Sequence, residues 1–347
     1  MGEAITINGR AVDAVRPYII AEIGSNHDGN LAQAKQLIAS AAAAGADAVK
    51  FQTFKADRHY SKYTPGFSYL DHNKRGTYEL IRSLEINRDW HTVLMAYAAK
   101  HGVTFLSSPC DKEAVDLLGQ LDMKAFKVAS FDLTDGDLIA RMASFQKPMI
   151  LSTGMADYGD IQWAVNRCRK EGNDKIILLQ CTSLYPAPVE LSNLTAMKTL
   201  QDTFQVPVGY SDHTLGTHVS IAAAALGACV IEKHFTLDRT LSGPDHPFAV
   251  EPEEMKTMIT DIREVGKALG DGVKNGPRKE EEEMYWKGRR SLHTTRDLQA
   301  GERLTKADLC IKRPGYGISP RFMEEVKGMV LTQTVKADHW ITWEDLK

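Results

Sequence analysis

The sequence lacks the features that mark secreted, membrane-spanning and nucleic-acid-binding proteins. Its five cysteines are odd in number and show no metal-ligand spacing, so free thiols in a reducing compartment fit better than a disulfide framework. No uncharged apolar stretch approaches about 18 residues, which argues against a membrane span. The N-terminus has no basic segment followed by an apolar run, and the net charge of −3 argues against a chain-wide basic surface. We therefore expect a cytoplasmic protein that uses neither nucleic acid nor membrane as a partner.

A dinucleotide-binding fingerprint is missing as well. No GxGxxG motif follows the first apolar run or lies elsewhere in the repeating part of the chain, so a nicotinamide or flavin cofactor has no sequence support. With 43% hydrophobic and 25% charged residues, the composition is that of an ordinary globular protein. The 347 residues suffice for one large domain plus a small one, or for two medium domains.

A pattern that repeats about every 30 residues begins after Pro17. Each repeat contains a short apolar run, a polar loop and an amphipathic or Ala-rich segment, and the predicted helices include 31–44, 89–100, 158–170, 217–226 and 253–269. Such alternation indicates a parallel sheet covered by helices on both faces. Eight repeats in about 250 residues favour an α/β fold of the (β/α)8 TIM-barrel type over an open α/β sheet with extra strands. The eight apolar runs are 18–24, 48–53, 104–108, 125–130, 149–153, 176–181, 206–211 and 229–235.

The chain divides into a large domain, a linker and a small domain. We predict a catalytic barrel over 1–270, opened by a hairpin over 1–16 whose turn is Asn8-Gly9. Residues 271–289 are rich in glycine and charge, which is typical of an exposed linker. Residues 290–347 are predicted to form a small second domain, whose size makes an independent catalytic role implausible.

Two histidines, His213 and His234, each end a predicted strand, about one βα repeat apart. The ends of neighbouring strands converge on one rim of a barrel, which is where (β/α)8 enzymes perform their chemistry. The two imidazoles could therefore hold one metal ion. The alternative is that each histidine is an ordinary core or loop residue.

Charged side chains also fall on the predicted inner face of the barrel. Strand alternation places Lys50, Glu232 and His234 on the same side of their strands. A lysine is costly to bury without an anion, so Lys50 and Lys127 indicate a negatively charged ligand. Short hydroxyl side chains at the strand ends would supply the neutral hydrogen bonds that a phosphate or carboxylate needs. The alternatives are structural salt bridges from the lysines to Glu22 or Glu232, and helix caps formed by the hydroxyls.

Motifs with distinctive residues lie at these strand ends, in a fixed order along the chain. They occupy residues 21–29, 50–57, 151–155, 181–186, 209–214, 231–235 and 243–246. Together they closely resemble the sialic acid (N-acetylneuraminate) synthase family over nearly the whole chain. Residues 290–302 and 312–315 resemble the antifreeze-like domain of that family, a β-clip fold also called SAF.

The resemblance implies an enzyme that condenses phosphoenolpyruvate with N-acetylmannosamine or a related N-acyl amino sugar. The products would be a nine-carbon 3-deoxy-2-keto acid and phosphate. A divalent metal, Mn²⁺ or Mg²⁺, would be held by His213 and His234. The family forms domain-swapped homodimers, in which Arg313 would reach the acyl group of the sugar from the partner subunit. Phosphoenolpyruvate would bind Lys50, Ser108, Lys127, Ser130, Ser152, Ser183 and Ser211, and the sugar would contact Gln52, Tyr185 and Asp245.

The residues agree chemically with this reaction. Lys50 and Lys127 would neutralise the phosphate and carboxylate groups of phosphoenolpyruvate. A metal held by two imidazoles would polarise the aldehyde as a Lewis acid, and C3 of phosphoenolpyruvate would attack it. The resulting cation at C2 needs a carboxylate to orient water or accept a proton. Glu22 and Glu232 are the candidates, with Glu22 favoured for the water.

The identity of the sugar is where the sequence departs from the family pattern. Many N-acetylneuraminate synthases carry Lys-Ala-Ser after the motif at 243–246, whereas this chain has Pro247-Phe248-Ala249. Phe248 adds apolar surface beside the sugar, which suits a deoxy or bulkier acylated acceptor. Residues 127–131 and 318–322 resemble spore-coat polysaccharide and pseudaminic acid synthases. The alternatives are therefore a pseudaminic, legionaminic or spore-coat type synthase, a synthase acting on arabinose 5-phosphate or erythrose 4-phosphate, and a non-catalytic sugar-binding protein on the same fold.

Overall fold

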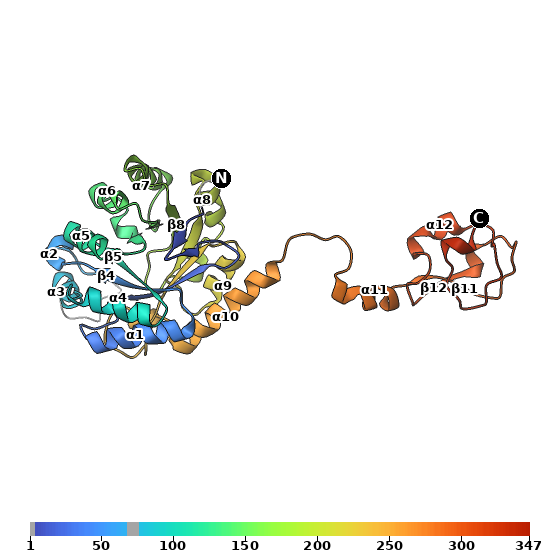
Figure 1. The fold of residues 1–347 in the computed structure, drawn as a ribbon, viewed down its shortest axis with the longest axis horizontal. Helices are drawn as coiled ribbons and strands as arrows, with labels where there is room; N and C mark the ends of the chain where they lie inside the picture. The colour runs from blue at the N-terminus through green and yellow to red at the C-terminus, as the bar shows by residue number, and fades with distance from the viewer. Residues whose placement is uncertain (1–3, 68–75) are drawn as a thin grey trace. The chain divides into compact units, whose positions relative to one another are not determined.

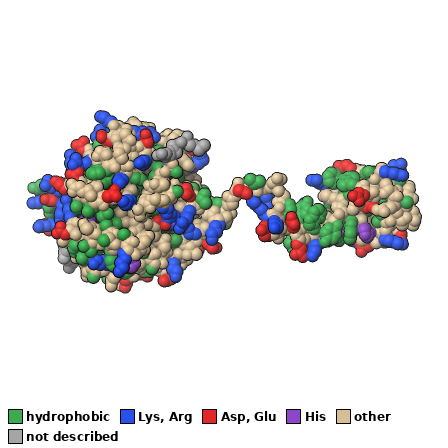
Figure 2. Space-filling view, viewed as in Figure 1, with side chains coloured by type: hydrophobic (Ala, Val, Ile, Leu, Met, Phe, Trp, Pro, Cys, Tyr) green, Lys and Arg blue, Asp and Glu red, His purple; other side chains and the backbone are tan. Residues whose placement is uncertain are grey.

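The computed structural model describes residues 4–67 and 76–347. The chain forms two compact units that meet at Gly270 and Asp271, and each is described by itself. Figure 1 shows the strands of the first unit surrounded by its helices. On the face in Figure 2, positive and negative side chains are interspersed over this unit. Within the described residues, no helix is both long enough and apolar enough to cross a bilayer.

The first unit is built on an eight-stranded parallel sheet in the order β5-β4-β3-β10-β9-β8-β7-β6. The two strands at the ends of this order, β5 and β6, also lie against each other, so the sheet is nearly closed into a barrel. The predicted α/β barrel is confirmed. The strands are β3 (Tyr18–Gly24), β4 (Ala48–Thr53), β5 (Thr104–Pro109), β6 (Phe126–Val128), β7 (Met149–Ser152), β8 (Ile176–Cys181), β9 (Val208–Asp212) and β10 (Val230–His234).

The helices form the outer layer, and α1 and α10 lie side by side (Figure 1). Helix α1 begins where the side chain of Asn30 accepts hydrogen bonds from two backbone N–H groups, and it ends at Gly45, whose φ of 94° suits glycine. The longer helices are α1 (Leu31–Ala44), α4 (Trp90–Lys100), α5 (Lys112–Gln120), α6 (Gly136–Ser144), α7 (Tyr158–Lys170), α8 (Ala196–Phe204), α9 (His218–Ala225) and α10 (Pro252–Leu269). Two shorter helices, α2 (Ala56–His59) and α3 (Thr77–Ser83), follow β4.

An antiparallel hairpin of β1 (Thr6–Ile7) and β2 (Arg10–Ala11) precedes the barrel. Its turn residues Asn8 and Gly9 have φ values of 51° and 78°, the positive angles that a two-residue hairpin turn requires. The apolar side chains of this hairpin pack with inward-facing residues from the first half of the strands, among them Tyr18, Ala48 and Ile177.

Strand alternation then sets the character of the barrel interior. The inward positions of β3 are Tyr18 and Ile20, followed by Glu22, and those of β10 are Val230, followed by Glu232. The interior is thus apolar where the strands begin and polar where they end. The outward positions pack against the helices in a separate, larger hydrophobic cluster. Among the described residues that face the barrel interior, the charged side chains therefore lie toward the carboxyl ends of the strands.

The second unit has its own hydrophobic cluster, which includes Leu292, Leu309 and Leu331. Its two strands, β11 (Ser291–Thr294) and β12 (Leu309–Lys312), pair antiparallel, and α12 (Met323–Val326) follows. The segment predicted as a linker is not wholly irregular, because 282–288 form helix α11 (Glu282–Gly288). An ion pair between Lys287 and Glu283, one helical turn apart, supports this helix.

Candidate functional site

Two lysines and two glutamates form a continuous buried network at the carboxyl ends of β3, β4, β6 and β10. Lys50 Nζ lies 2.7 Å from Glu22 Oε2 and 3.7 Å from Glu232 Oε2. Lys127 Nζ lies 3.7 Å from Glu232 Oε1. All four residues are at most 5% exposed. The salt bridges foreseen as an alternative to ligand binding are therefore present, and the charges of the four groups cancel in the absence of an anion.

Short hydroxyl groups surround this network. Lys50 donates to Ser108 Oγ over 3.2 Å, and Lys127 donates to Ser152 Oγ over 2.6 Å. Ser211 Oγ donates to Glu232 Oε1 over 2.8 Å. These serines bind the charged groups of the network, and none of them caps a helix among the residues that the structure describes.

Ser130 and Ser183 lie close to the backbone at Gly154. The Gly154 N–H donates to Ser130 Oγ over 2.9 Å. A Cβ at residue 154 would lie 2.2 Å from Ser183 Oγ and 2.8 Å from Ser130 Oγ, so a larger residue would push these hydroxyls away. Among the described residues, Ser183 Oγ is buried without a hydrogen-bond partner. It is thus a polar group available to a ligand.

The two carboxylates have different proton affinities. Burial raises the pKa of Glu22 to about 7: it outweighs the opposing effect of Lys50, and the charge of Glu232 adds a smaller contribution in the same direction as burial. Burial also acts to raise the pKa of Glu232, but Lys127 and Lys50 together bring it below its ordinary value. Near neutral pH, Glu232 is the permanent counter-ion, and Glu22 can exchange a proton.

His213 and His234 lie next to each other, with ring centroids 5.4 Å apart. The Nδ1 of His213 donates to the carbonyl oxygen of Thr182 over 2.8 Å, so the neutral ring carries its lone pair on Nε2. Burial lowers the pKa of His213, but the neighbouring Cys181 and the Thr182 carbonyl bring it above its ordinary value. The Nδ1 of His234 is buried and has no hydrogen-bond partner among the described residues. Burial, and then the charge of His213, hold the pKa of His234 well below its ordinary value, so the ring is neutral. Both imidazoles therefore fit a metal ion.

Asp245 lies beside this pair, with Oδ2 3.8 Å from the Nδ1 of His234. Burial raises the pKa of Asp245 to about 6. In the described part of the chain, one group of three possible metal ligands has its ligand atoms within 4.8 Å of one another, and it lies elsewhere. The ligand atoms of His213, His234 and Asp245 are more widely spaced than that. The metal role of the histidine pair stays a prediction.

Aromatic rings line the side of the histidine pair where the sugar was predicted to bind. The ring of Tyr185 lies 4.4 Å from that of His213 and 5.6 Å from that of Phe248, measured between centroids. Phe248 in turn lies 4.9 Å from His234. Gln52 donates to Glu22 Oε1 over 2.9 Å and so joins this side to the lysine network.

Arg313 belongs to the second unit, where its Nε donates to the carbonyl oxygen of Gly288 over 2.7 Å. Its predicted contact with the sugar stays a prediction.

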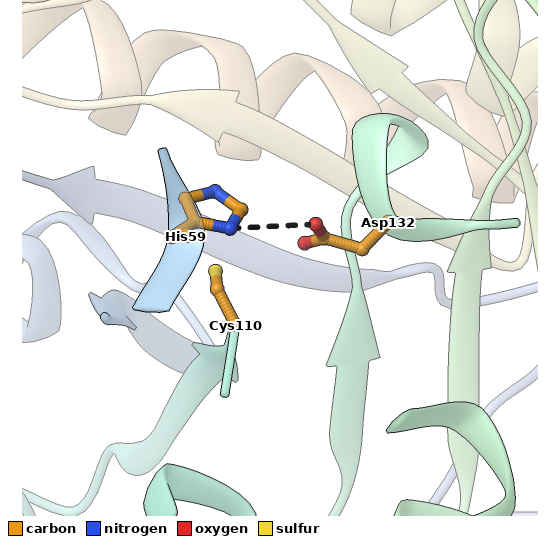
Figure 3. Close-up of side chains that lie close together, drawn as sticks. All are labelled: His59, Cys110 and Asp132. Atoms are coloured by element: carbon orange, nitrogen blue, oxygen red, sulfur yellow. Dashed lines mark ion pairs between the residues drawn. The ribbon is translucent and has the colours of Figure 1, made fainter. Parts of the chain in front are cut away.

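The sequence interpretation missed two groups near the rim. Cys181 Sγ lies 3.8 Å from the Nδ1 of His213. His59, Cys110 and Asp132 gather in a separate cluster (Figure 3). The only sequence signal was position, because Cys110 follows Ser108 by two residues and Asp132 follows Ser130 by two.

Comparisons with known proteins agree with this architecture. A sequence model of the NeuB family matches residues 37–274, and a SAF domain model matches residues 289–347. The chain is 45% identical to the N,N'-diacetyllegionaminic acid synthase of Campylobacter jejuni, over 94% of this chain and 99% of that protein. It is 40% identical to the synthase of the same description in Legionella pneumophila, over 98% and 99%.

Solved structures show the same likeness. The spore coat polysaccharide biosynthesis protein SpsE of Bacillus subtilis superposes with a TM-score of 0.68 at 37% identity, covering 99% of each chain. The N-acetylneuraminic acid synthetase of Leptospira borgpetersenii superposes with a TM-score of 0.72 at 32% identity, covering 82% of this chain and 95% of that one. The buried network at the barrel end thus belongs to a chain that matches these proteins over 82% to 99% of its length. The chain is a member of the NeuB family with a C-terminal SAF domain.

Proposed function

We propose that this protein is a nonulosonic acid synthase that condenses phosphoenolpyruvate with a 2,4-diacetamido-trideoxy hexose, the acceptor class of a legionaminic-type synthase. The observation that carries the reaction type is the buried pair of lysines, whose charges are balanced by Glu22 and Glu232. Beside them lie two imidazoles that can bind a metal ion in their neutral form. The acceptor class is supported by the full-length similarity to two N,N'-diacetyllegionaminic acid synthases. Phe248 against His234 and Tyr185 supplies an apolar surface for a deoxy carbon.

When phosphoenolpyruvate binds, its anionic groups replace Glu22 and Glu232 as partners of the two lysines. Its phosphate and carboxylate groups accept charge-assisted hydrogen bonds from Lys50 and Lys127, which in the free protein are neutralised by Glu22 and Glu232. Ser183 Oγ adds a neutral donor, and so does the hydroxyl of Ser130, which accepts from the N–H of Gly154 and keeps its own hydrogen to donate. Because the donors are fixed by the barrel strands, little reorganisation is needed when charge moves during the reaction.

The reaction joins C3 of phosphoenolpyruvate to the aldehyde carbon of the sugar. The aldehyde oxygen takes up one proton to become a hydroxyl, which balances the proton that the added water releases. A divalent ion held by His213 and His234 would supply Lewis-acid polarisation of that aldehyde. Glu22 accepts a proton from the water that adds at C2, and its pKa of about 7 suits a base at neutral pH. The tetrahedral centre then collapses to the 2-keto acid, with cleavage of the C2–O bond and departure of phosphate.

The proposal is tested by phosphate release from phosphoenolpyruvate with a panel of acceptors: N-acetylmannosamine, its 6-phosphate and a 2,4-diacetamido-trideoxy hexose. The expected result is turnover only with an acceptor present, and the highest kcat/KM with the diacetamido sugar. A preference for N-acetylmannosamine would overturn the acceptor class but keep the reaction. Binding of sugars without any phosphate release would favour a sugar-binding protein.

Two controls make the assay specific to the site. Glu22→Gln keeps the shape of the side chain and its contact with Gln52 but cannot accept a proton, so kcat should fall by about 100-fold or more. Glu253→Gln makes the same change at an exposed position in the first turn of α10 and should leave kcat unchanged.

We also propose that the active form is a domain-swapped homodimer in which Arg313 of one protomer contacts the acyl group of the sugar bound by its partner. The motif around Arg313 and the SAF match support this arrangement. Arg313→Ala should raise the KM for the acceptor more than that for phosphoenolpyruvate. Full activity in a soluble chain truncated after Gly270 would contradict it.

A further inference from the structure

Three side chains from separate segments converge beside the lysine network. His59 ends helix α2, Cys110 follows strand β5, and Asp132 belongs to a short 3-10 helix (Ser130–Asp132) after β6. Figure 3 shows all three pointing toward one another. One ligand atom from each lies within 4.8 Å of the other two, and His59 Nδ1 is 3.9 Å from Asp132 Oδ1.

Cys110 and Asp132 interact directly, whereas a gap remains between the His59 ring and the Asp132 carboxylate. The 3.9 Å separation between His59 and Asp132 is too long for a hydrogen bond. Among the residues that the structure describes, no hydrogen bond occupies the Nδ1 of His59. The ring is nevertheless held in place, since it stacks on Phe54 and meets Tyr60 edge to face, with centroids 6.1 and 4.8 Å apart. A fixed imidazole thus presents a free nitrogen to a thiol and a carboxyl group.

Without a cation, the two potential anionic ligands of the cluster are shifted toward their protonated forms. Burial raises the pKa of the Cys110 thiol well above its ordinary value, and the neighbouring Asp132 carboxylate raises it further. Burial also raises the pKa of Asp132. A bound divalent ion would reverse both effects, because it stabilises the thiolate and the carboxylate together.

We propose that His59, Cys110 and Asp132 form a binding site for a thiophilic divalent cation of the Zn²⁺ class, separate from the histidine pair. Imidazole, thiolate and carboxylate are the three ligand types that zinc uses, at bond lengths of about 2.0–2.3 Å. A tetrahedron with those bonds has edges of about 3.4–3.6 Å, so closing the cluster requires a movement of about 1 Å. The fourth position is open to water. Mg²⁺ prefers oxygen ligands, which makes it a poor occupant.

A cation here would tie three loops of the rim together. Cys110 lies two residues beyond Ser108, which accepts from Lys50, and the charge of Lys127 acts on Asp132. The segments that carry His59, Cys110 and Asp132 would then be cross-linked next to the proposed anion pocket. Zinc should therefore raise the thermal stability of the protein as well as bind to it.

The test uses the full-length chain, stripped with a chelator and titrated with Co²⁺ as a spectroscopic probe for zinc. A thiolate ligand gives a near-ultraviolet charge-transfer band from sulfur to Co²⁺. The expected result is a band in the parent protein that disappears in Cys110→Ser. It should persist in Cys181→Ser, the matched control, because Cys181 is the thiol that lies beside His213.

Zinc affinity and thermal stability provide a second readout. His59→Ala should weaken Zn²⁺ binding at this site by about tenfold or more and reduce the rise in melting temperature that zinc causes, with an unchanged circular dichroism spectrum. This variant decides the matter if Cys110→Ser fails to fold. The proposal would be overturned by any of three results: no charge-transfer band in the parent protein, loss of the band in Cys181→Ser alone, or unchanged zinc affinity in His59→Ala.

Discussion

Replacing Lys127 with methionine tests the anion pocket without dismantling the barrel. In the free protein, Lys127 Nζ donates to Ser152 Oγ and to the carbonyl oxygen of Val128, and it faces Glu232 at 3.7 Å. Methionine fills much of the same space but carries no charge. Glu232 keeps Lys50 at 3.7 Å and the hydroxyl of Ser211 at 2.8 Å, so its carboxylate is not left without partners.

The magnitude follows from the type of bond that is lost. A hydrogen bond to a charged group contributes about 1.5–3 kcal/mol, which corresponds to about 10- to 150-fold in affinity. The Kd for phosphoenolpyruvate should rise by that factor in Lys127→Met. A buried charge that loses all its partners costs about 3–5 kcal/mol of folding stability. The loss of folding free energy in Lys127→Met should be smaller, because Glu232 retains two partners.

The assay is isothermal titration calorimetry with phosphoenolpyruvate, accompanied by thermal unfolding of each variant. Lys170→Met, at an exposed position in α7, serves as the matched control and should bind phosphoenolpyruvate like the parent protein. A folded Lys127→Met protein with an unchanged Kd would refute the assignment of the lysines to the anion pocket.

Three further predictions concern single residues at the rim. His27 is fully buried, and burial lowers its pKa from 6.5 to about 4, so stability that is present above pH 6.5 is lost as the pH falls toward 4. The parent protein should lose about 3 kcal/mol more than His27→Gln between pH 7 and pH 4 in denaturant unfolding, and equal losses would contradict this. Gly154→Ala should raise the Kd for phosphoenolpyruvate about tenfold or more in calorimetry, because the new Cβ would meet Ser183 Oγ. Phe248→Ala should raise the KM of a deoxy acceptor more than that of N-acetylmannosamine in steady-state assays, and an equal rise would argue against apolar recognition.

The alternation of apolar and polar residues made most of the barrel predictable. The run at 18–24 became β3 without change, because every residue in it is buried. The run at 125–130 became a shorter strand, Phe126–Val128, since the chain turns into a 3-10 helix at Ser130. Helix α11 lies in a segment whose charge and glycine content are typical of a linker, although Glu283 and Lys287 have the spacing of a helical ion pair.

The sequence predicts which residues belong to the candidate site but not which of them form ion pairs with one another. Inward alternation identified Lys50 and Glu232, yet only the three-dimensional arrangement shows Lys50 between two carboxylates. The cluster of His59, Cys110 and Asp132 was out of reach, because its members come from three loops with no regular ligand spacing. Periodicity identifies residues on one face of one element, whereas contacts between loops depend on how the loops fold.

The central claim is that water adds at C2 of phosphoenolpyruvate in a condensation carried out at the Lys50–Glu232 network. The most direct measurement is the reaction in ¹⁸O-labelled water, with mass analysis of the phosphate and quantitation of the nine-carbon acid. The account predicts acid and phosphate in equal amounts, only with an acceptor present, and phosphate free of ¹⁸O because the C2–O bond breaks. Phosphate that carries ¹⁸O, or phosphate released without an acceptor, would contradict it.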